Sequence, residues 1–168
     1  QFVLAVRQID TGGRTFSGTS RGGVLTSHDR YVRATMERAR GMIDVDAVLA
    51  LWHQLKRTAR HEPDAMTHGD LMPNNLLAEA GRLVGVIDVG TTGPADPALD
   101  LQPAWNLFGA DARAAFRAEL GDGQDVWDRG RGWALAQAAG CLHYYRDTNP
   151  VMSQIAHRTL TALLNDAS

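Results

Sequence analysis

The sequence predicts an α+β fold that is mainly helical, and three observations lead to this prediction. Apolar residues recur at helical spacing, most clearly over 45–55. Two short apolar runs, 76–78 and 83–87, flank a Glu-Ala-Gly-Arg segment that is typical of a tight β-hairpin connection. The length of 168 residues, 44% of them apolar, suits a single globular domain with a sizeable core over residues 1–168.

The part of the chain before residue 60 is predicted to hold three helices and a long loop. The first helix runs to Ile9 and has no capping side chain before it, so we expect the chain to begin inside a longer protein. The Gly/Ser/Thr-rich stretch 11–23 lacks the Gly-x-x-x-x-Gly-Lys pattern of a phosphate-binding loop and is predicted to be a flexible connection. Two helices follow within 27–60, and the single lysine, Lys56, is expected to be solvent-exposed on the second.

The segment around the predicted hairpin carries the side chains best suited to chemistry. Phosphoryl transfer needs a carboxylate that orients the attacking hydroxyl, and Asp70 can supply it. A Pro-Asn turn can return Asn75 beside Asp70, and pairing of the strands would bring Asn75 and Asp88 to the same end of the hairpin. Their oxygens, with nucleotide phosphates, would form a Mg²⁺ site.

Two further aspartates follow the hairpin. Asp96 precedes Pro97 and is predicted to cap a helix start. Asp100 precedes the apolar segment 101–108, so it could be a partly buried brace that is hydrogen-bonded to the catalytic loop. Three more helices are predicted, at Asp111 to Leu120, Val126 to Tyr145 and Val151 to Asn165.

Three motifs in this order resemble one known family. They are His68-Gly-Asp70 with Asn75, then Ile87-Asp88-Val-Gly90, then Asp96-Pro-Ala-Leu-Asp100-Leu101. The chain is therefore similar to the aminoglycoside phosphotransferase and choline kinase-like family, which has the protein-kinase fold. Fainter similarity to antibiotic phosphotransferases continues through 127–133 and 144–150.

The resemblance implies roles, cofactors and a substrate class. ATP or GTP with Mg²⁺ would be the cofactors, and the partner would be a small molecule with an acceptor hydroxyl, an aminoglycoside or macrolide-type antibiotic. By this resemblance Asp70 is the catalytic base, Asn75 and Asp88 bind Mg²⁺, His68 and Asp100 brace the catalytic loop, and Leu77 and Ile87 form the floor under the adenine.

The chain also departs from the family. Met72 stands where the family often has His, and it cannot donate a charge-assisted hydrogen bond to a phosphate. Val89 replaces a usual Phe, and Thr91-Thr92 replaces a commonly acidic position. Kinases also need a glycine-rich loop and a strand-borne lysine, and neither is recognisable in the 67 residues before His68. We therefore expect residues 1–168 to be the C-terminal lobe, with the N-terminal nucleotide-covering lobe absent.

Two sets of side chains bear on the substrate. Acids could attract a cationic aminoglycoside, although interleaved arginines favour a solvated face. Aromatic residues could line a macrolide pocket or belong to the core. The acids are Asp111, Glu119, Asp122, Asp125, Asp128 and Asp147, and the aromatics are Trp105, Trp127, Trp133, Tyr144 and Tyr145.

Other function classes are less compatible with the sequence. A metal-dependent phosphoesterase would need more metal ligands, and the remaining histidines form no paired ligand spacing. A truncated, catalytically inactive binding or regulatory lobe stays open as an alternative.

A net charge of −2 without a basic run argues against binding to nucleic acid, and no apolar stretch is long enough for a membrane span. Cys141 is the single cysteine, so no internal disulfide is possible, and it is predicted to be buried. A reducing cytoplasm is therefore the expected location. The oligomeric state stays undetermined.

Overall fold

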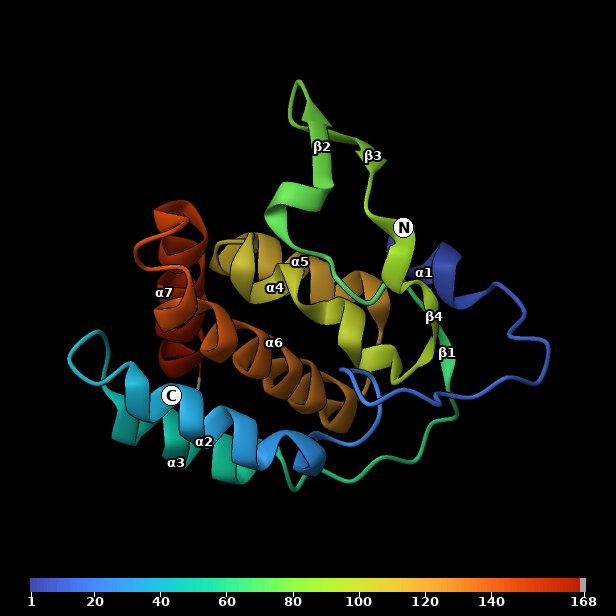
Figure 1. Ribbon diagram of the computed structural model, residues 1–168. Helices are drawn as coiled ribbons and strands as arrows, with labels where there is room; N and C mark the ends of the chain where they lie inside the picture. Colours follow the sequence, from blue (N-terminus) through green and yellow to red (C-terminus); the bar gives the residue numbers. More distant parts are fainter. Residues whose placement is uncertain (167–168) are drawn as a thin grey trace.

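The longest helix, α6 (Gln124–Tyr144), runs through the middle of the molecule, and the other helices pack around it (Figure 1). In the computed structural model, which describes residues 1–166, α6 contributes many of its side chains to the core, among them the fully buried Trp133 and Leu135. It packs most extensively against α7 (Pro150–Asn165), η4 (Pro97–Leu101) and α2 (Asp29–Arg38). The mainly helical α+β class predicted from the sequence is confirmed.

Two glycines of α6 allow leucine side chains to pack closely against this helix. An added Cβ on Gly130 would lie 2.7 Å from Leu101 Cδ1, and one on Gly132 would lie 2.6 Å from Leu25 Cδ1. Glycine is unfavourable within a helix, so these positions are explained by packing rather than by helix propensity.

The N-terminal third holds α1 (Phe2–Arg7), a long irregular loop, η1 (Leu25–His28), α2 and α3 (Val45–Leu55). The loop and the two later helices agree with the prediction. Asp44 caps α3 by accepting a 3.0 Å hydrogen bond from the backbone N–H of Ala47.

Asp29 joins α2 to α3. Its Oδ1 accepts hydrogen bonds from Trp52 Nε1 at 2.9 Å and from Lys56 Nζ at 2.7 Å. The prediction that Lys56 is solvent-exposed was therefore wrong, because only 12% of its side chain is accessible and its charge is paired. A partner 27 positions away cannot be recognised from helical spacing alone.

The strands form two small antiparallel sheets. β1 (Ala65–Thr67) pairs with β4 (Gly93–Ala95), and β2 (Leu76–Glu79) pairs with β3 (Arg82–Val86) with an irregularity between Leu77 and Ala78. The β2–β3 hairpin is the one predicted from the sequence. Figure 1 shows that it projects away from the helices.

Short turns and helices connect these parts. η2 (Pro73–Asn75) leads into β2, η3 (Val89–Thr91) follows β3, and α4 (Pro103–Asn106) follows η4. The last three helices are α5 (Ala110–Leu120), α6 and α7, so the predicted helices occur with ends displaced by no more than two residues. Within the described residues, no helix is long and apolar enough to cross a membrane.

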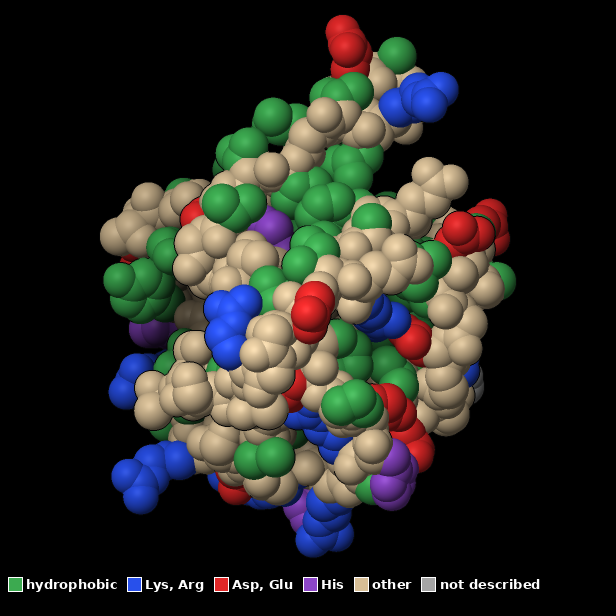
Figure 2. Space-filling view, turned by 90° about the vertical axis from the view of Figure 1, so that its right-hand side faces the viewer, with side chains coloured by type: hydrophobic (Ala, Val, Ile, Leu, Met, Phe, Trp, Pro, Cys, Tyr) green, Lys and Arg blue, Asp and Glu red, His purple; other side chains and the backbone are tan. Residues whose placement is uncertain are grey.

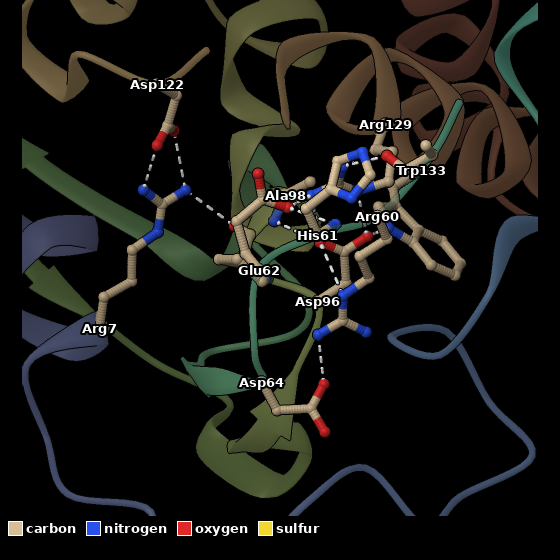
Figure 3. Close-up of polar contacts among 12 residues, drawn as sticks. Arg7, Arg60, His61, Glu62, Asp64, Asp96, Ala98, Asp122, Arg129 and Trp133 are labelled. Atoms are coloured by element: carbon tan, nitrogen blue, oxygen red, sulfur yellow. Dashed lines mark hydrogen bonds and ion pairs between the residues drawn. The ribbon is translucent and has the colours of Figure 1, made fainter. Parts of the chain in front are cut away.

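Asp96 forms a buried polar connection between η4 and α6 (Figure 3). The predicted cap is confirmed, because Asp96 Oδ1 accepts a 3.0 Å hydrogen bond from the Ala98 backbone N–H. The other oxygen, Oδ2, accepts bonds of 3.0 Å from both Arg129 Nε and Trp133 Nε1. A buried carboxylate needs such partners, since leaving it unpaired is strongly unfavourable.

Candidate active site

Asp100 fixes the position of the loop between β1 and β2. This fully buried carboxylate accepts hydrogen bonds from the backbone N–H groups of His68 at 2.7 Å and Gly69 at 2.9 Å. Burial raises the pKa of Asp100, and the two backbone bonds oppose that rise. Gly69 has φ +85°, and a Cβ there would lie 2.9 Å from the carbonyl oxygen of Thr91, so the loop needs glycine at this position.

His68 connects this loop to the end of β3. Its Nδ1 accepts a 3.3 Å hydrogen bond from the Asp70 backbone N–H, so the ring proton lies on Nε2, 3.1 Å from the Ile87 carbonyl oxygen. Thr91 Oγ1 donates to the His68 carbonyl at 2.7 Å. The buried imidazole thus fixes the loop relative to the segment that carries Asp88.

Asp70 and Asn75 face each other across the turn. Asn75 Nδ2 donates to the Asp70 carbonyl at 2.9 Å and to its Oδ2 at 3.3 Å. Asn75 is 3% exposed, so this amide is fixed. The other carboxylate oxygen, Asp70 Oδ1, accepts from Arg21 Nη2 at 2.9 Å and from Gln137 Nε2 at 3.3 Å.

Asn75 and Asp88 lie at the same end of the hairpin, because the Ile87 backbone N–H donates to the Asn75 carbonyl at 3.0 Å. Asp88 is exposed and adopts a left-handed backbone with φ 61° and ψ 59°. In the part of the chain that the structure describes, Asn75 Oδ1 accepts a hydrogen bond only from Asn74 Nδ2, at 3.1 Å, and the exposed Asn74 side chain can turn away. One amide oxygen and one free carboxylate are the hard donors that suit Mg²⁺ together with nucleotide phosphates.

The described residues contain no group of three or more His, Cys, Asp or Glu side chains arranged to hold a metal ion. Such a group is the ligand set that a two-metal phosphoesterase requires.

Leu77 and Ile87 stay exposed on the hairpin, each at 46%. Leu83, Val84 and Val89 are also exposed, and Figure 2 shows hydrophobic side chains gathered along the hairpin and at its base. This apolar face offers a surface on which a planar ring could lie.

Comparison with known proteins decides the family. A sequence model described as the phosphotransferase enzyme family matches residues 1–133 of this chain. The chain belongs to the phosphotransferase enzyme family. Among curated relatives, aminoglycoside 3'-phosphotransferases from Salmonella typhimurium and Streptomyces fradiae are 33% and 37% identical, each over 90 residues. These matches cover 48% and 44% of this chain but only 33% and 34% of the relatives, so the chain matches about a third of their length.

Solved structures of phosphotransferases share the fold. Macrolide 2'-phosphotransferase type I superimposes with a TM-score of 0.56 at 18% identity, over 94% of this chain and 56% of that one. A thermostable mutant of aminoglycoside phosphotransferase APH(4)-Ia, in ternary complex with AMP-PNP and hygromycin B, gives 0.61 at 16% identity, over 99% of this chain and 62% of that one. These likenesses establish the kinase-like fold of this family member.

One departure of this chain from the phosphotransferase family now has a structural explanation. Met72, which stands where the family often has His and cannot donate a hydrogen bond to a phosphate, is 4% exposed, and its sulfur lies 3.5 Å from Asn106 Nδ2. The Asn106 amide also donates to the Leu71 carbonyl at 3.0 Å. Met72 therefore fills the core below the loop.

Sequence reasoning missed two side chains that contact Asp70. Arg21 comes from the Gly/Ser/Thr-rich loop, which was predicted to be a simple connection, and Gln137 comes from the middle of α6. No local pattern marks either residue, since they lie 49 and 67 positions from Asp70. For the five aromatic residues the sequence left a pocket or a core position open. Trp105, Trp127 and Trp133 are buried in the core, whereas Tyr144 and Tyr145 border a cleft.

Proposed function

We propose that this chain is the catalytic lobe of an ATP-dependent kinase that transfers a γ-phosphate to a hydroxyl group of a small molecule. Antibiotics are the first acceptors to test, since the relatives are named for aminoglycosides and macrolides. The observation that carries the proposal is the placement of Asp70 against Asn75, on a loop held by Asp100.

In this mechanism Asp70 accepts a hydrogen bond from the acceptor hydroxyl and takes its proton as the phosphoryl group transfers. Asn75 and Asp88 would hold Mg²⁺, which when bound neutralises charge on the phosphates of ATP or GTP. Leu77 and Ile87 would form the floor under the base. His68 and Asp100 act as positioning residues, because both act through the backbone of the loop.

The same proposal includes a separate nucleotide-covering lobe, of which residues 1–168 would be the C-terminal partner. Its support is chemical: a kinase needs a lysine that pairs with the phosphates. The single lysine of this chain, Lys56, is paired with Asp29 at 2.7 Å. An inactive binding or regulatory lobe is the second candidate, favoured by the ion pair of 2.9 Å between Arg21 and Asp70.

The test is acceptor-stimulated release of ADP, measured together with Mg²⁺-ATP binding on the protein extended upstream so that it includes a nucleotide-covering lobe. Asp70→Asn should lower release by about 10²-fold or more, the contribution typical of a general base, and leave nucleotide binding unchanged. Asp111→Asn, a change at an exposed carboxylate on α5, is the matched control and should leave both unchanged. Full activity in Asp70→Asn would refute the assignment, and nucleotide binding without release in the unaltered protein would favour the inactive lobe.

A further inference from the structure

A cleft of about 680 Å³ lies beside Asp70, within the range typical of sites for drug-sized ligands. Its walls come from the loop that carries Arg21, from η1, and from α2 and α6. Arg21 and Gln137 line it and also donate hydrogen bonds to Asp70 Oδ1, so the cleft adjoins the proposed base. Asp70 itself does not line the cleft, so a molecule bound there would lie next to the two side chains that contact it.

The lining contains no Asp or Glu, and Arg21 is its only residue with a permanent charge. Burial lowers the pKa of His28, the lining histidine; a backbone hydrogen bond at Ser20 opposes this and nearby Arg21 adds to it, so the net direction favours the neutral imidazole. Asp70 itself is already paired with Arg21. The cleft therefore lacks the uncompensated carboxylates that several ammonium groups would require.

The acids considered from the sequence lie elsewhere. Asp122 pairs with Arg7 at 2.9 Å, Asp128 with Arg131 at 3.2 Å, and Asp147 with its neighbour Arg146 at 2.9 Å. Asp111, Glu119 and Asp125 do not line the cleft either. None of the six acids therefore lines this cleft, and the interleaved ion pairs agree with the solvated face that the sequence favoured.

Two buried nitrogen atoms on the cleft wall have no hydrogen-bond partner among residues 1–166. They are Arg21 Nη1 and His28 Nε2. Unpaired buried polar atoms are rare in folded proteins, but six further ones in the described residues belong to side chains outside the cleft, so these two alone do not mark a ligand site. A guanidinium nitrogen can only donate, so the partner of Arg21 Nη1 must offer an oxygen or another acceptor.

Aromatic rings supply the rest of the surface. Tyr31 and Tyr144 are 52% and 73% exposed, and Tyr144 stands edge-on to Tyr145 with centroids 4.8 Å apart. Gly140 leaves room for Tyr31, whose hydroxyl would be 2.4 Å from an added Cβ. Exposed tyrosines bind ring systems and apolar surfaces.

We infer that this cleft is the acceptor site and that it selects hydroxylated molecules of low positive charge, with a ring surface for the tyrosines and an oxygen for Arg21. Polycationic aminoglycosides are disfavoured there. The inference rests on the proposed function, because it assumes that the acceptor hydroxyl is presented to Asp70. By this inference, Arg21 is the residue that makes the cleft selective for acceptors of low positive charge.

Calorimetric titration of the 168-residue protein tests this without any need for turnover. The probes are erythromycin, which has one amine, chloramphenicol, an uncharged aryl diol, and the polyamine hygromycin B. At least one of the first two should bind ten-fold or more tightly than hygromycin B. Tyr144→Ala should weaken that binding about ten-fold.

Arg21→Ala provides the sharper readout, because it leaves the Asp70 carboxylate without its cation. Affinity for the low-charge probe should fall, and affinity for hygromycin B should rise. Arg14→Ala is the control, since Arg14 lies in the same loop, is exposed, and its side chain donates only to the Thr11 carbonyl. It should change neither affinity.

The inference would be overturned if hygromycin B bound the unaltered protein as tightly as both other probes, or if neither low-charge probe bound up to millimolar concentration. An unchanged preference in Arg21→Ala would also overturn it. Failure of the proposed function is separate: it would appear as binding with the expected preference and no acceptor-stimulated release of ADP.

Discussion

Several single residues at this site fix the backbone of the loop that carries Asp70. Asp100 is the clearest case, because both of its oxygens accept backbone N–H groups of the loop that carries Asp70. Sequence reasoning could suggest a brace from the position of Asp100 before an apolar segment. It could not identify the donors, which lie 31 and 32 positions away and meet Asp100 only in the folded chain.

Asp100→Asn should lower the free energy of unfolding at pH 7 by about 1–3 kcal/mol, the cost of leaving one buried backbone donor unpaired. The amide would turn an NH₂ group towards one of two backbone donors and leave that donor unpaired. Urea unfolding followed by tryptophan fluorescence measures the change. Glu119→Gln, at an exposed position of α5, should alter the midpoint little, and equal midpoints for the two variants would contradict the brace.

At the scale of elements, the helices and the hairpin could be predicted because their signals are local: apolar periodicity, caps and turn residues. Asp96 before Pro97 and the Glu-Ala-Gly-Arg turn are examples. What could not be predicted is how elements meet. Lys56 was misjudged because Asp29 lies on another helix, and the loop of Arg21 was taken for a connection because its contact with Asp70 is purely tertiary.

The link between α2 and α3 predicts a dependence of stability on pH. The hydrogen bond from Lys56, with those from Trp52 and Arg33, lowers the pKa of Asp29 to about 2. A carboxyl whose pKa is depressed in the folded state stabilises the fold above its unfolded pKa, near 4, and this contribution is lost as the pH falls towards 2.

Asp29→Asn should therefore lower the free energy of unfolding at pH 7 by about 1 kcal/mol. This is less than the pKa shift alone would give, because one third of the Asp29 side chain is exposed and solvent screens its charge. The difference from the unaltered protein should shrink as the pH is lowered from 4 to 2. Urea midpoints over this range provide the measurement. Asp46→Asn, at a highly exposed carboxylate, should show a small effect at every pH; a constant difference for Asp29→Asn would disprove the assigned pKa.

At the scale of the whole molecule, two different surfaces meet at the loop that carries Asp70. One surface is the exposed apolar hairpin, with Asn75 and Asp88 at its base. The other is the tyrosine-lined cleft, whose lining residues Arg21 and Gln137 donate hydrogen bonds to Asp70 Oδ1. In the proposed kinase the nucleotide binds along the hairpin and the acceptor in the cleft. Nucleotide and acceptor binding should then respond to different substitutions.

Asp88 provides the test of the nucleotide side, and its backbone decides the choice of variant. At φ 61° alanine would add strain, whereas asparagine tolerates the left-handed region, so Asp88→Asn keeps the fold while removing the charge. We expect Mg²⁺-ATP affinity to fall ten-fold or more, and affinity for ATP without Mg²⁺ to stay unchanged, in calorimetric titrations. Glu79→Gln, on the same hairpin but distant from Asn75, should leave both values unaltered. Undiminished Mg²⁺-ATP affinity in Asp88→Asn would exclude its carboxylate as a metal ligand, whereas loss with and without Mg²⁺ would mean that Asp88 supports the nucleotide surface itself.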